Sequence, residues 1–319
     1  MAGEFENQKV SEILSKIRAH RDKIEKFKVL EIVFIVALVF FLILAGACYV
    51  KYDYDKAFRY AIPFLISVVV ALFFARQGVL QREEIQKLLG QNFVSKIIAE
   101  EVQLIEYKPV FNISDDLIKR CSLLPGFNYS KANDYIRGKY KGVEFICFDL
   151  HLRDGIKHSQ HDTFKGQVIH LELKKAIAGT IKFKKNDNPR RDVRKIDTVH
   201  NAFGALSASK TETEIHVGNE HLDIFFSIKT NHPEMASVVL TEERLKRISE
   251  TIYQASGHTN VEINGKDIFI TTDNGFDAFV VDKNIYDEYT LERACQRYRS
   301  ELKRILAIID KIITDDELF

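Results

Sequence analysis

The sequence has few cysteines and no excess of charge of one sign. Its four cysteines, Cys48, Cys121, Cys147 and Cys295, are scattered, and no two form a Cys-x-x-Cys pair. This usage suits a reducing compartment and provides no paired-cysteine metal site. The formal net charge is +1 with 29% charged residues, so the chain as a whole gives no electrostatic reason to expect nucleic-acid binding.

The common catalytic motifs are also missing. The sequence contains no Walker-type loop and no GxGxxG, GxSxG or HExxH pattern. Each of these motifs holds a phosphate-binding backbone, a nucleophile or a pair of zinc ligands at fixed spacing. Their absence lowers the expectation of an enzyme without excluding one, and we expect no cofactor.

Two long apolar runs are present near the start, Ile32 to Val50 and Tyr60 to Ala75. A helix rises about 1.5 Å per residue and the bilayer core is about 30 Å thick, so a span needs roughly 20 apolar residues. The first run carries no charge, whereas the second is shorter and ends at Arg59 and Arg76, which can extend toward headgroups. We expect a transmembrane hairpin over residues 29–76; helices buried in a soluble core are the alternative.

Basic residues and aromatic residues indicate the orientation of this hairpin. Five Lys or Arg lie between Arg18 and Lys28 and three between Arg76 and Lys87, against three in the connector. Tyrosines gather around the connector KYDYDKAFR, as in an aromatic belt at the outer interface. Because cytoplasmic flanks are enriched in Lys and Arg, both ends of the hairpin are expected in the cytoplasm.

The remaining sequence predicts helices and then a sheet. We expect an amphipathic helix over 1–28, juxtamembrane helices over 77–125 and an α+β cytoplasmic domain over 126–319. Short segments with period two predict a mostly antiparallel sheet with flanking helices. They read DYIRGKY, VEFICFDLHL, QVIHLELKK, GTIKFKK, HLDIFFSIKT, MASVVLT, VEINGKDIFIT and FDAFVV. Residues 186–213 show no clear pattern.

The last predicted helix has apolar residues at alternating steps of four and three. They are Leu291, Cys295, Tyr298, Leu302, Ile305, Ile309 and Ile312. This spacing forms an a/d seam of about three heptads, which must pack against something. Docking on the protein's own sheet, or on the helix after the second run, is one possibility, and formation of a homo-oligomer is the other.

Several of these segments resemble a bacterial protein family. The stretches NDYIRGKYKGVEFICFDLHL and FKGQVIHLELKK, followed by HLDIFFSIKT and VVLTEERLKRI, are similar to the family catalogued as domain of unknown function 3137. The resemblance covers roughly Asp134 to Val281. It implies a bacterial membrane protein, and hence the inner (cytoplasmic) membrane with two spans, and it transfers no catalytic residue.

One loop holds a group of side chains that could bind a metal. In HLRDGIKHSQHD, the imidazoles of His151, His158 and His161 and the carboxylate of Asp162 are ligands suited to zinc or another divalent ion. A metal-dependent hydrolase would follow from such a site. The alternative is an exposed polar loop between two strands, because no further ligand at fixed spacing completes the set.

A basic stretch suggests a contact with lipid. Its residues are Lys182, Lys184, Lys185, Arg190, Arg191, Arg194 and Lys195. A domain tethered to the membrane lies within reach of anionic headgroups, and each Lys or Arg near them contributes about 1 kcal/mol. A solvated loop is the alternative.

Two classes of function follow from the sequence. The first is a membrane-anchored interaction or scaffold protein, whose partners are the lipid bilayer, anionic headgroups and a second copy or another protein bound through the terminal helices. The second is a membrane-associated metal-dependent hydrolase, or a lipid or ligand sensor with a pocket between the sheet and the last helix. No nucleic-acid partner is expected.

Overall fold

The structure is a computed structural model that describes residues 2–155, 159–186, 212–217, 220–255, 257–279, 285 and 287–313. The chain divides into two compact units. Unit 1 comprises Met1–Asn92 and Val281–Ala294, and unit 2 comprises Phe93–Val280 and Cys295–Phe319. The apolar runs belong to the first unit and the sheet to the second.

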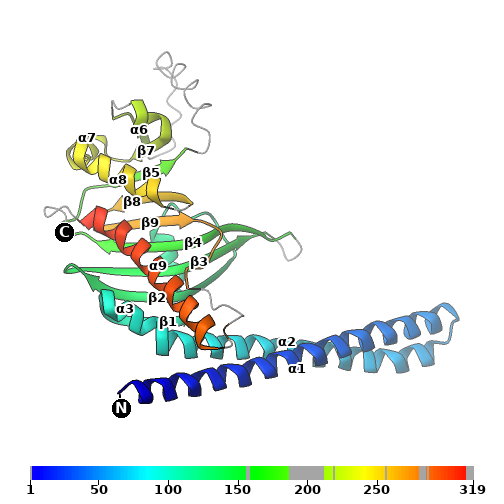
Figure 1. The fold of residues 1–319 in the computed structure, drawn as a ribbon. Helices are drawn as coiled ribbons and strands as arrows, with labels where there is room; N and C mark the ends of the chain where they lie inside the picture. The colour runs from blue at the N-terminus through cyan, green and yellow to red at the C-terminus, as the bar shows by residue number, and fades with distance from the viewer. Residues whose placement is uncertain are drawn as a thin grey trace. The chain divides into compact units, whose positions relative to one another are not determined.

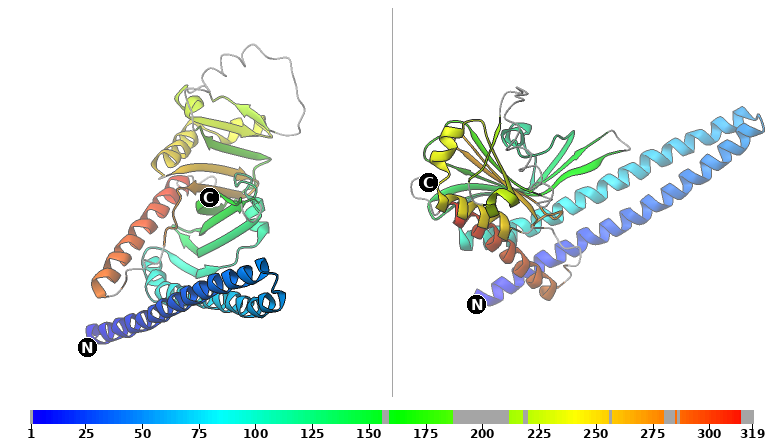
Figure 2. Two further views of the ribbon diagram at one scale, coloured as in Figure 1. Left: turned by 90° about the vertical axis from the view of Figure 1, so that its right-hand side faces the viewer. Right: turned by 90° about the horizontal axis from the view of Figure 1, so that it is seen from above.

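Unit 1 is built on two long antiparallel helices, α1 (Ala2–Val50) and α2 (Tyr54–Leu89), which lie side by side (Figures 1 and 2). A tight turn joins them, and the side chain of Asp53 caps α2 by accepting from the backbone N–H of Lys56. The predicted amphipathic helix and the first apolar run are therefore one continuous helix.

Aromatic and polar side chains set the pairing of α1 with α2. The ring of Phe74 lies 5.9 Å from the ring of Phe27 and 5.9 Å from that of Phe34. Further from the turn, His20 Nδ1 lies 2.7 Å from Gln81 Oε1. The two antiparallel helices are thus in contact from the turn at least as far as His20.

The hairpin exposes apolar side chains along one part of its length and buries them along another. Ile13, Leu14 and Ile17 of α1 and Ile85 and Leu89 of α2 are buried. Closer to the turn, large apolar side chains are exposed on both helices, including Val29, Ile32, Val36, Phe40, Ile43, Phe58, Leu65, Val69, Leu72 and Val79. Both helices are long and apolar enough to cross a membrane.

At its C-terminal end α2 passes through a π-helical turn, η1 (Gly90–Val94), into α3 (Ser95–Glu101). The side chain of Asn92 donates to the Leu88 carbonyl at 2.7 Å. A side chain that competes for a helix carbonyl in this way is one of the ordinary causes of an irregular helical turn.

The core of unit 2 is a nine-stranded sheet in the order β1-β2-β3-β4-β9-β8-β5-β7-β6, and every described pairing is antiparallel. The strands are β1 (Gln103–Phe111), β2 (Tyr129–Tyr140), β3 (Val143–Asp154), β4 (His161–Glu172), β5 (Thr180–Lys185), β6 (Thr213–Ile215), β7 (Phe226–Thr230), β8 (His258–Asn264) and β9 (Asp267–Asp273). This confirms the predicted α+β fold with a mostly antiparallel sheet.

Helices flank this sheet. They are α4 (Asp115–Arg120), α6 (Glu220–Phe225), α7 (Pro233–Val239), α8 (Glu242–Gln254) and α9 (Glu288–Ile313). From Cys295 onward, α9 lies across one face of the sheet, and the Tyr298 ring is 6.0 Å from that of Phe279 (Figure 1). The a/d seam of α9 is buried within the chain itself, apart from the half-buried Cys295.

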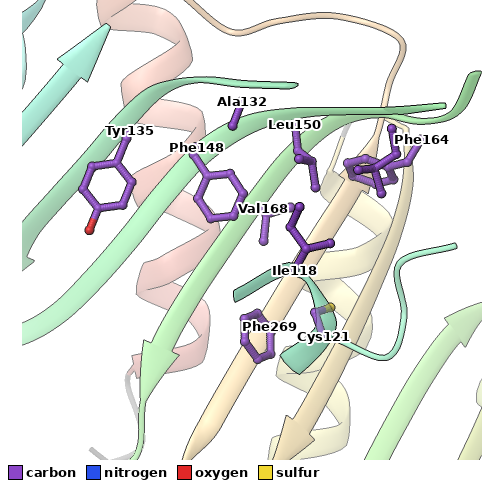
Figure 3. Close-up of a cluster of buried hydrophobic side chains, with 10 residues drawn as sticks. Ile118, Cys121, Ala132, Tyr135, Phe148, Leu150, Phe164, Val168 and Phe269 are labelled. Carbon is purple, nitrogen blue, oxygen red and sulfur yellow. The ribbon is translucent and has the colours of Figure 1, made fainter. Parts of the chain in front are cut away.

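Alternation along the strands fills both faces of the sheet. Phe148 and Leu150 of β3 and Phe269 of β9 point toward α4, where they join Ile118 and Cys121 in one buried cluster (Figure 3). Neighbouring residues in the strands point to the opposite face, toward α8 and α9. The result is two apolar layers, one on each side of the sheet.

Three predicted strands have other structures in whole or in part. The first half of HLDIFFSIKT, residues 221–225, belongs to α6, and only its second half forms β7. The segment MASVVLT forms most of α7, because His232 caps this helix by accepting from the Met235 N–H and Pro233 occupies its first turn. Residues 276–279 of FDAFVV form turns and bends, and Val280 and Val281 lie outside the described residues. The stretch 77–125, for which we expected helices, also contains the edge strand β1.

Candidate functional site

A group of polar side chains is buried between the sheet and α9. We call it the buried carboxyl cluster, and it consists of Tyr107 of β1, Asp134 of β2, Asp149 of β3, Gln167 of β4 and Arg304 of α9. Asp134, Asp149 and Gln167 are each no more than 2% exposed. Four strands and one helix therefore meet at a polar centre.

Hydrogen bonds connect the members of this cluster to each other and to the backbone. Tyr107 Oη donates to Asp134 Oδ1 at 2.6 Å. Arg304 Nη2 donates to Gln167 Oε1 at 2.7 Å. Asp149 Oδ2 accepts from the backbone N–H of Ala278 at 2.7 Å, which fixes the segment after β9 against β3. Buried polar atoms need such partners, because each one left unsatisfied destabilises the fold.

A backbone irregularity places Asp134 in the cluster. Asp134 has φ 52, in the left-handed region, and the β2–β3 register shifts between Asn133 and Ile136. Such a bulge rotates a side chain that regular alternation would place elsewhere. Asparagine and aspartate tolerate this conformation better than most residues, which is consistent with Asp at this position.

Burial controls the ionisation of the cluster. Removal from water raises the pKa of the Asp149 carboxyl well above its usual range, and the neighbouring Asp134 raises it further. Burial also raises the pKa of the Tyr107 hydroxyl, as does the nearby Asp134 carboxylate. The raised pKa values favour the neutral forms of the Asp149 carboxyl and the Tyr107 hydroxyl. The cluster therefore acts as a structural link between the strands and α9.

Sequence reasoning missed this cluster. The only signal was the presence of Asp134 and Asp149 at the start and in the middle of segments that were otherwise expected to be strands. A carboxylate in a strand usually faces solvent, so the sequence gave no reason to bring these two together.

A second buried carboxyl, that of Glu262 in β8, is on the opposite face. Its two oxygens accept from the Ser122 N–H at 2.8 Å, the Ser122 hydroxyl at 2.9 Å and the Leu123 N–H at 3.2 Å. Burial raises the pKa of Glu262, while Ser122 and Lys182 oppose that shift. The carboxyl thereby fastens the loop after α4 to the sheet.

The predicted metal residues lie at the β3–β4 hairpin. His151 Nε2 is 2.8 Å from Asp162 Oδ1, and Arg153 Nε donates to the same oxygen at 3.0 Å. The hydrogen bond from His151 lowers the pKa of Asp162, and Arg153 adds to this effect. His161 is exposed opposite Asp154, and His158 lies outside the described residues.

Among the residues that the structure describes, no three His, Cys, Asp or Glu side chains are grouped so as to hold a metal. Of the four candidate ligands, the structure brings His151 and Asp162 together, and the guanidinium of Arg153 shares the Asp162 carboxylate. Since His158 is not described, the metal site stays a prediction.

The basic stretch is described only in part. Lys182, Lys184 and Lys185 lie in β5, and Lys182 forms an ion pair with Glu212. Lys184 is exposed and Lys185 is half-buried. Arg190, Arg191, Arg194 and Lys195 lie outside the described residues, so the lipid contact also stays a prediction.

An apolar hollow opens between the sheet and the ends of α8 and α9, and we call it the α8–α9 cleft. Its cavity volume is about 30 Å³. Its apolar lining residues are Val239, Leu240, Ile248, Val261, Ile263, Ile268 and Ile312. The basic residues Arg244, Arg247 and Lys311 also line it. This volume is about that of one water molecule in the liquid, too small for a lipid or a cofactor.

Comparisons with known proteins add a family. No curated protein matches the chain. A solved structure, the "crystal structure of the mycobacterial trehalose monomycolate transport factor A, TtfA", is similar over 68% of this chain and 95% of that chain, at 10% sequence identity and a TM-score of 0.36. That similarity is too low to support a conclusion about this chain.

The family described as "Protein of unknown function (DUF3137)" matches residues 162–313. The match begins in β4 and extends to the end of α9, so it includes the α8–α9 cleft and the α9 side of the buried carboxyl cluster. The resemblance found in the sequence is thereby confirmed over this part of the chain, which is similar to a family of unknown function.

Proposed function

We propose that this protein is a membrane-anchored interaction protein whose helical hairpin crosses the bacterial inner membrane. One observation carries the proposal: α1 and α2 bury apolar side chains far from their turn and expose them near it. The exposed band runs from about residue 29 to 50 and from about 58 to 80, a length of about 33 Å along each helix. This length fits a hydrocarbon core of about 30 Å.

One buried polar group inside this band supports a lipid environment, because it has a partner within its own helix. Ser67 is buried, and its hydroxyl donates to the Pro63 carbonyl at 2.8 Å. Pro63 lies within α2, and such a hydrogen bond is a common feature of transmembrane helices that contain Ser. Exposed aromatic side chains at the turn, Tyr49, Tyr52 and Tyr54, are suited to an interface.

In this proposal both termini and unit 2 are cytoplasmic. The distribution of Lys and Arg on the flanks supports that side, and four unpaired cysteines suit a reducing compartment. The helices continue beyond the apolar band: α1 alone has 49 residues and is about 74 Å long. The remainder forms a paired stalk on the proposed cytoplasmic side.

The proposed interaction role depends on which surfaces of unit 2 a partner or the lipid headgroups can reach. Because the seam of α9 is buried by the chain itself, a protein partner or second copy would bind to another surface. Lys184 and the other residues of the basic stretch would contact anionic headgroups, since each Lys or Arg near such a surface adds about 1 kcal/mol.

Cysteine accessibility in intact cells tests the topology. In a background with Cys48→Ser and Cys295→Ser, a cysteine at exposed Tyr52 should react with a membrane-impermeant maleimide from outside. A cysteine at exposed Lys16 should react only after permeabilisation. Labelling of Lys16→Cys in intact cells would reject the cytoplasmic orientation.

Affinity purification from detergent extracts tests the interaction role. A tagged full chain should recover a second copy or the same partner protein in replicate experiments. A matched variant with Lys184→Gln should retain that recovery but float less with liposomes that contain anionic lipid. Recovery of the monomer alone, with equal flotation of both proteins, would contradict the proposal.

A further inference from the structure

A row of basic residues crosses one face of the sheet near the β3–β4 connection. Lys131 of β2 is paired with His151 of β3, and His151 is paired with Lys165 of β4. Two residues further along these strands Tyr129 is paired with Arg153, whose Cζ lies 5.8 Å from the centre of the Tyr129 ring. Residues directly opposite in antiparallel strands, and residues two apart in one strand, share a face. Three adjacent strands therefore gather these side chains on one surface.

Both lysines in this row are available to bind an anion. Within the part of the chain that the structure describes, neither ε-ammonium group forms an ion pair or a hydrogen bond. Lys131 is exposed and Lys165 is half-buried, and the side chain of Arg153 is 41% exposed. The positive charge of the row is therefore open to an anion from outside the chain.

Acidic side chains nearby leave the two lysines uncompensated. Asp162 Oδ1 lies 2.8 Å from His151 Nε2 and 3.0 Å from Arg153 Nε, so two basic groups already share this carboxylate. Asp154 follows Arg153 in β3 and alternates to the opposite face. Asp277, in the segment after β9, is half-buried. Among the described residues, the lysine row therefore keeps its positive charge.

Two exposed aromatic side chains flank the basic row. Tyr129 is 45% exposed and Phe276 is 73% exposed. The loop that carries Phe276 is fixed to β4, because the backbone N–H groups of Asn274 and Gly275 donate to the Lys165 carbonyl at 3.2 and 2.9 Å. The Phe276 N–H donates to Asn274 Oδ1 at 3.0 Å. An ordered loop thus holds a large apolar side chain in solvent beside the lysine row.

We infer that the sheet-end patch, which consists of Tyr129, Lys131, Arg153, Lys165 and Phe276, binds the headgroup layer of an anionic bilayer. The cations bind the headgroup phosphates, and the aromatic rings enter the interfacial layer, where basic and aromatic side chains are favoured. The inference rests on the proposed function, because the hairpin brings unit 2 to the bilayer. It names the lipid surface as a partner of the sheet itself.

Tryptophan fluorescence of the reconstituted full chain tests this contact. The chain contains no tryptophan, so Phe276→Trp introduces a single reporter into the patch. Lipids with brominated acyl chains should quench its emission in vesicles of phosphatidylcholine and phosphatidylglycerol, and much less in vesicles of phosphatidylcholine alone. Val238→Trp is the control, because Val238 is 70% exposed in α7 and lies outside the patch. Its reporter should remain unquenched in both kinds of vesicle.

Replacement of the two lysines tests the electrostatic part of the contact. In the Phe276→Trp background, Lys131→Gln combined with Lys165→Gln should lower the ratio of bound to unbound patch about thirtyfold, because each Lys near an anionic surface contributes about 1 kcal/mol and about 1.4 kcal/mol is a factor of ten. Lys139→Gln, at an exposed position of β2 outside the patch, should change nothing. Raising the salt from about 0.1 M to about 1 M should also weaken quenching, since the screening length falls from about 10 Å to about 3 Å.

Equal quenching of Phe276→Trp in the two vesicle compositions, equal quenching of Val238→Trp, or an unchanged signal in the double lysine variant would each overturn the inference. Flotation with phosphatidylcholine vesicles at about 1 M salt tests the proposed anchoring separately, because insertion of an apolar hairpin does not require anionic lipid. A chain that floats there, without the expected quenching in anionic vesicles, is anchored but lacks the contact. A chain that floats only with anionic vesicles at low salt, and is quenched in them, keeps the patch and contradicts the hairpin.

Discussion

The carboxyl of Asp149 in β3 accepts a hydrogen bond of 2.7 Å from the backbone N–H of Ala278, 129 residues further along the chain. Both groups are buried. The contact joins the middle of the sheet to the segment that follows β9, and neither local sequence predicts it. It therefore offers a direct way to test the architecture of unit 2.

Two replacements of Asp149 should distinguish the stability that its hydrogen bond contributes from the effect of its ionisable group. Asp149→Ala leaves the Ala278 N–H without an acceptor in a buried place, which costs about 1–3 kcal/mol. Asp149→Asn keeps an acceptor oxygen and removes the ionisable group, so it should cost much less. Thermal unfolding of the full chain in detergent, followed by circular dichroism, measures the difference, and equal losses in both variants would contradict this role.

The contribution of Asp149 to the stability of the fold should decrease as the pH rises. Burial raises the pKa of Asp149 in the folded state above the ordinary value of 3.8. Its contribution to stability is therefore fully present below that value and is lost as pH rises through the raised pKa, because the folded state then has to bury a charge. Between about pH 5 and pH 8, wild type should lose stability relative to Asp149→Asn. A difference that stays constant across this range would reject the raised pKa.

Gly166 of β4 is required by a close approach of two strands. A Cβ at this position would lie 1.9 Å from the carbonyl oxygen of Thr272 in β9, which is backbone and cannot rotate away. Gly166→Ala should therefore destabilise unit 2 by about 3 kcal/mol or more. Gly126→Ala is the control, since nothing lies within 4 Å of its added Cβ. Thermal unfolding of both variants checks the contrast, and equal midpoints would show that β4 and β9 can separate.

The sequence predicted those parts of the fold that repeat a local pattern. The period of two identified β2 to β5, and Asn264-Gly265 identified the turn of the β8–β9 hairpin. The a/d seam of α9 predicted a buried face, and this face is buried in the chain itself. In each case neighbouring residues contain the information.

Long-range contacts and competing local signals explain why the sequence did not predict the other elements or the buried carboxyl cluster. MASVVLT is rich in β-branched residues, but the capping by His232 and Pro233 directly before it favours a helix. The buried carboxyl cluster joins Tyr107, Asp149 and Arg304 from three distant segments, and no periodicity reveals such a meeting. His151 and Asp162, by contrast, were grouped from the sequence because a single hairpin connects them.

The metal hypothesis makes its own prediction. If His151, His158, His161 and Asp162 bind zinc, the purified full chain contains about one equivalent of it, and His158→Ala contains none. His216→Ala is a suitable control because His216 is exposed and lies outside this hairpin. Elemental analysis after dialysis measures the content. A metal content that is the same in wild type and His158→Ala would reject the site, and the His151–Asp162 pair would then be part of the hairpin's own polar surface.

The packing of α1 against α2 depends on small side chains at buried positions. Ala71 is 8% exposed, whereas Val69, on the same helix, is 66% exposed. Ala71→Leu adds three carbon atoms between packed helices and should destabilise the hairpin by about 1–3 kcal/mol. Val69→Leu should change stability by less than about 0.5 kcal/mol, because the larger side chain extends into the exposed band.

Thermal unfolding of the helical circular dichroism signal in micelles compares the two variants. A lower midpoint for Ala71→Leu alone would indicate that close helix contact, and not apolarity by itself, holds the hairpin together. This follows because lipid offers no hydrophobic driving force for one apolar helix to bind another, so association inside a bilayer relies on tight packing of small residues. Equal effects at both positions would mean that the helices lie in the membrane without a specific interface.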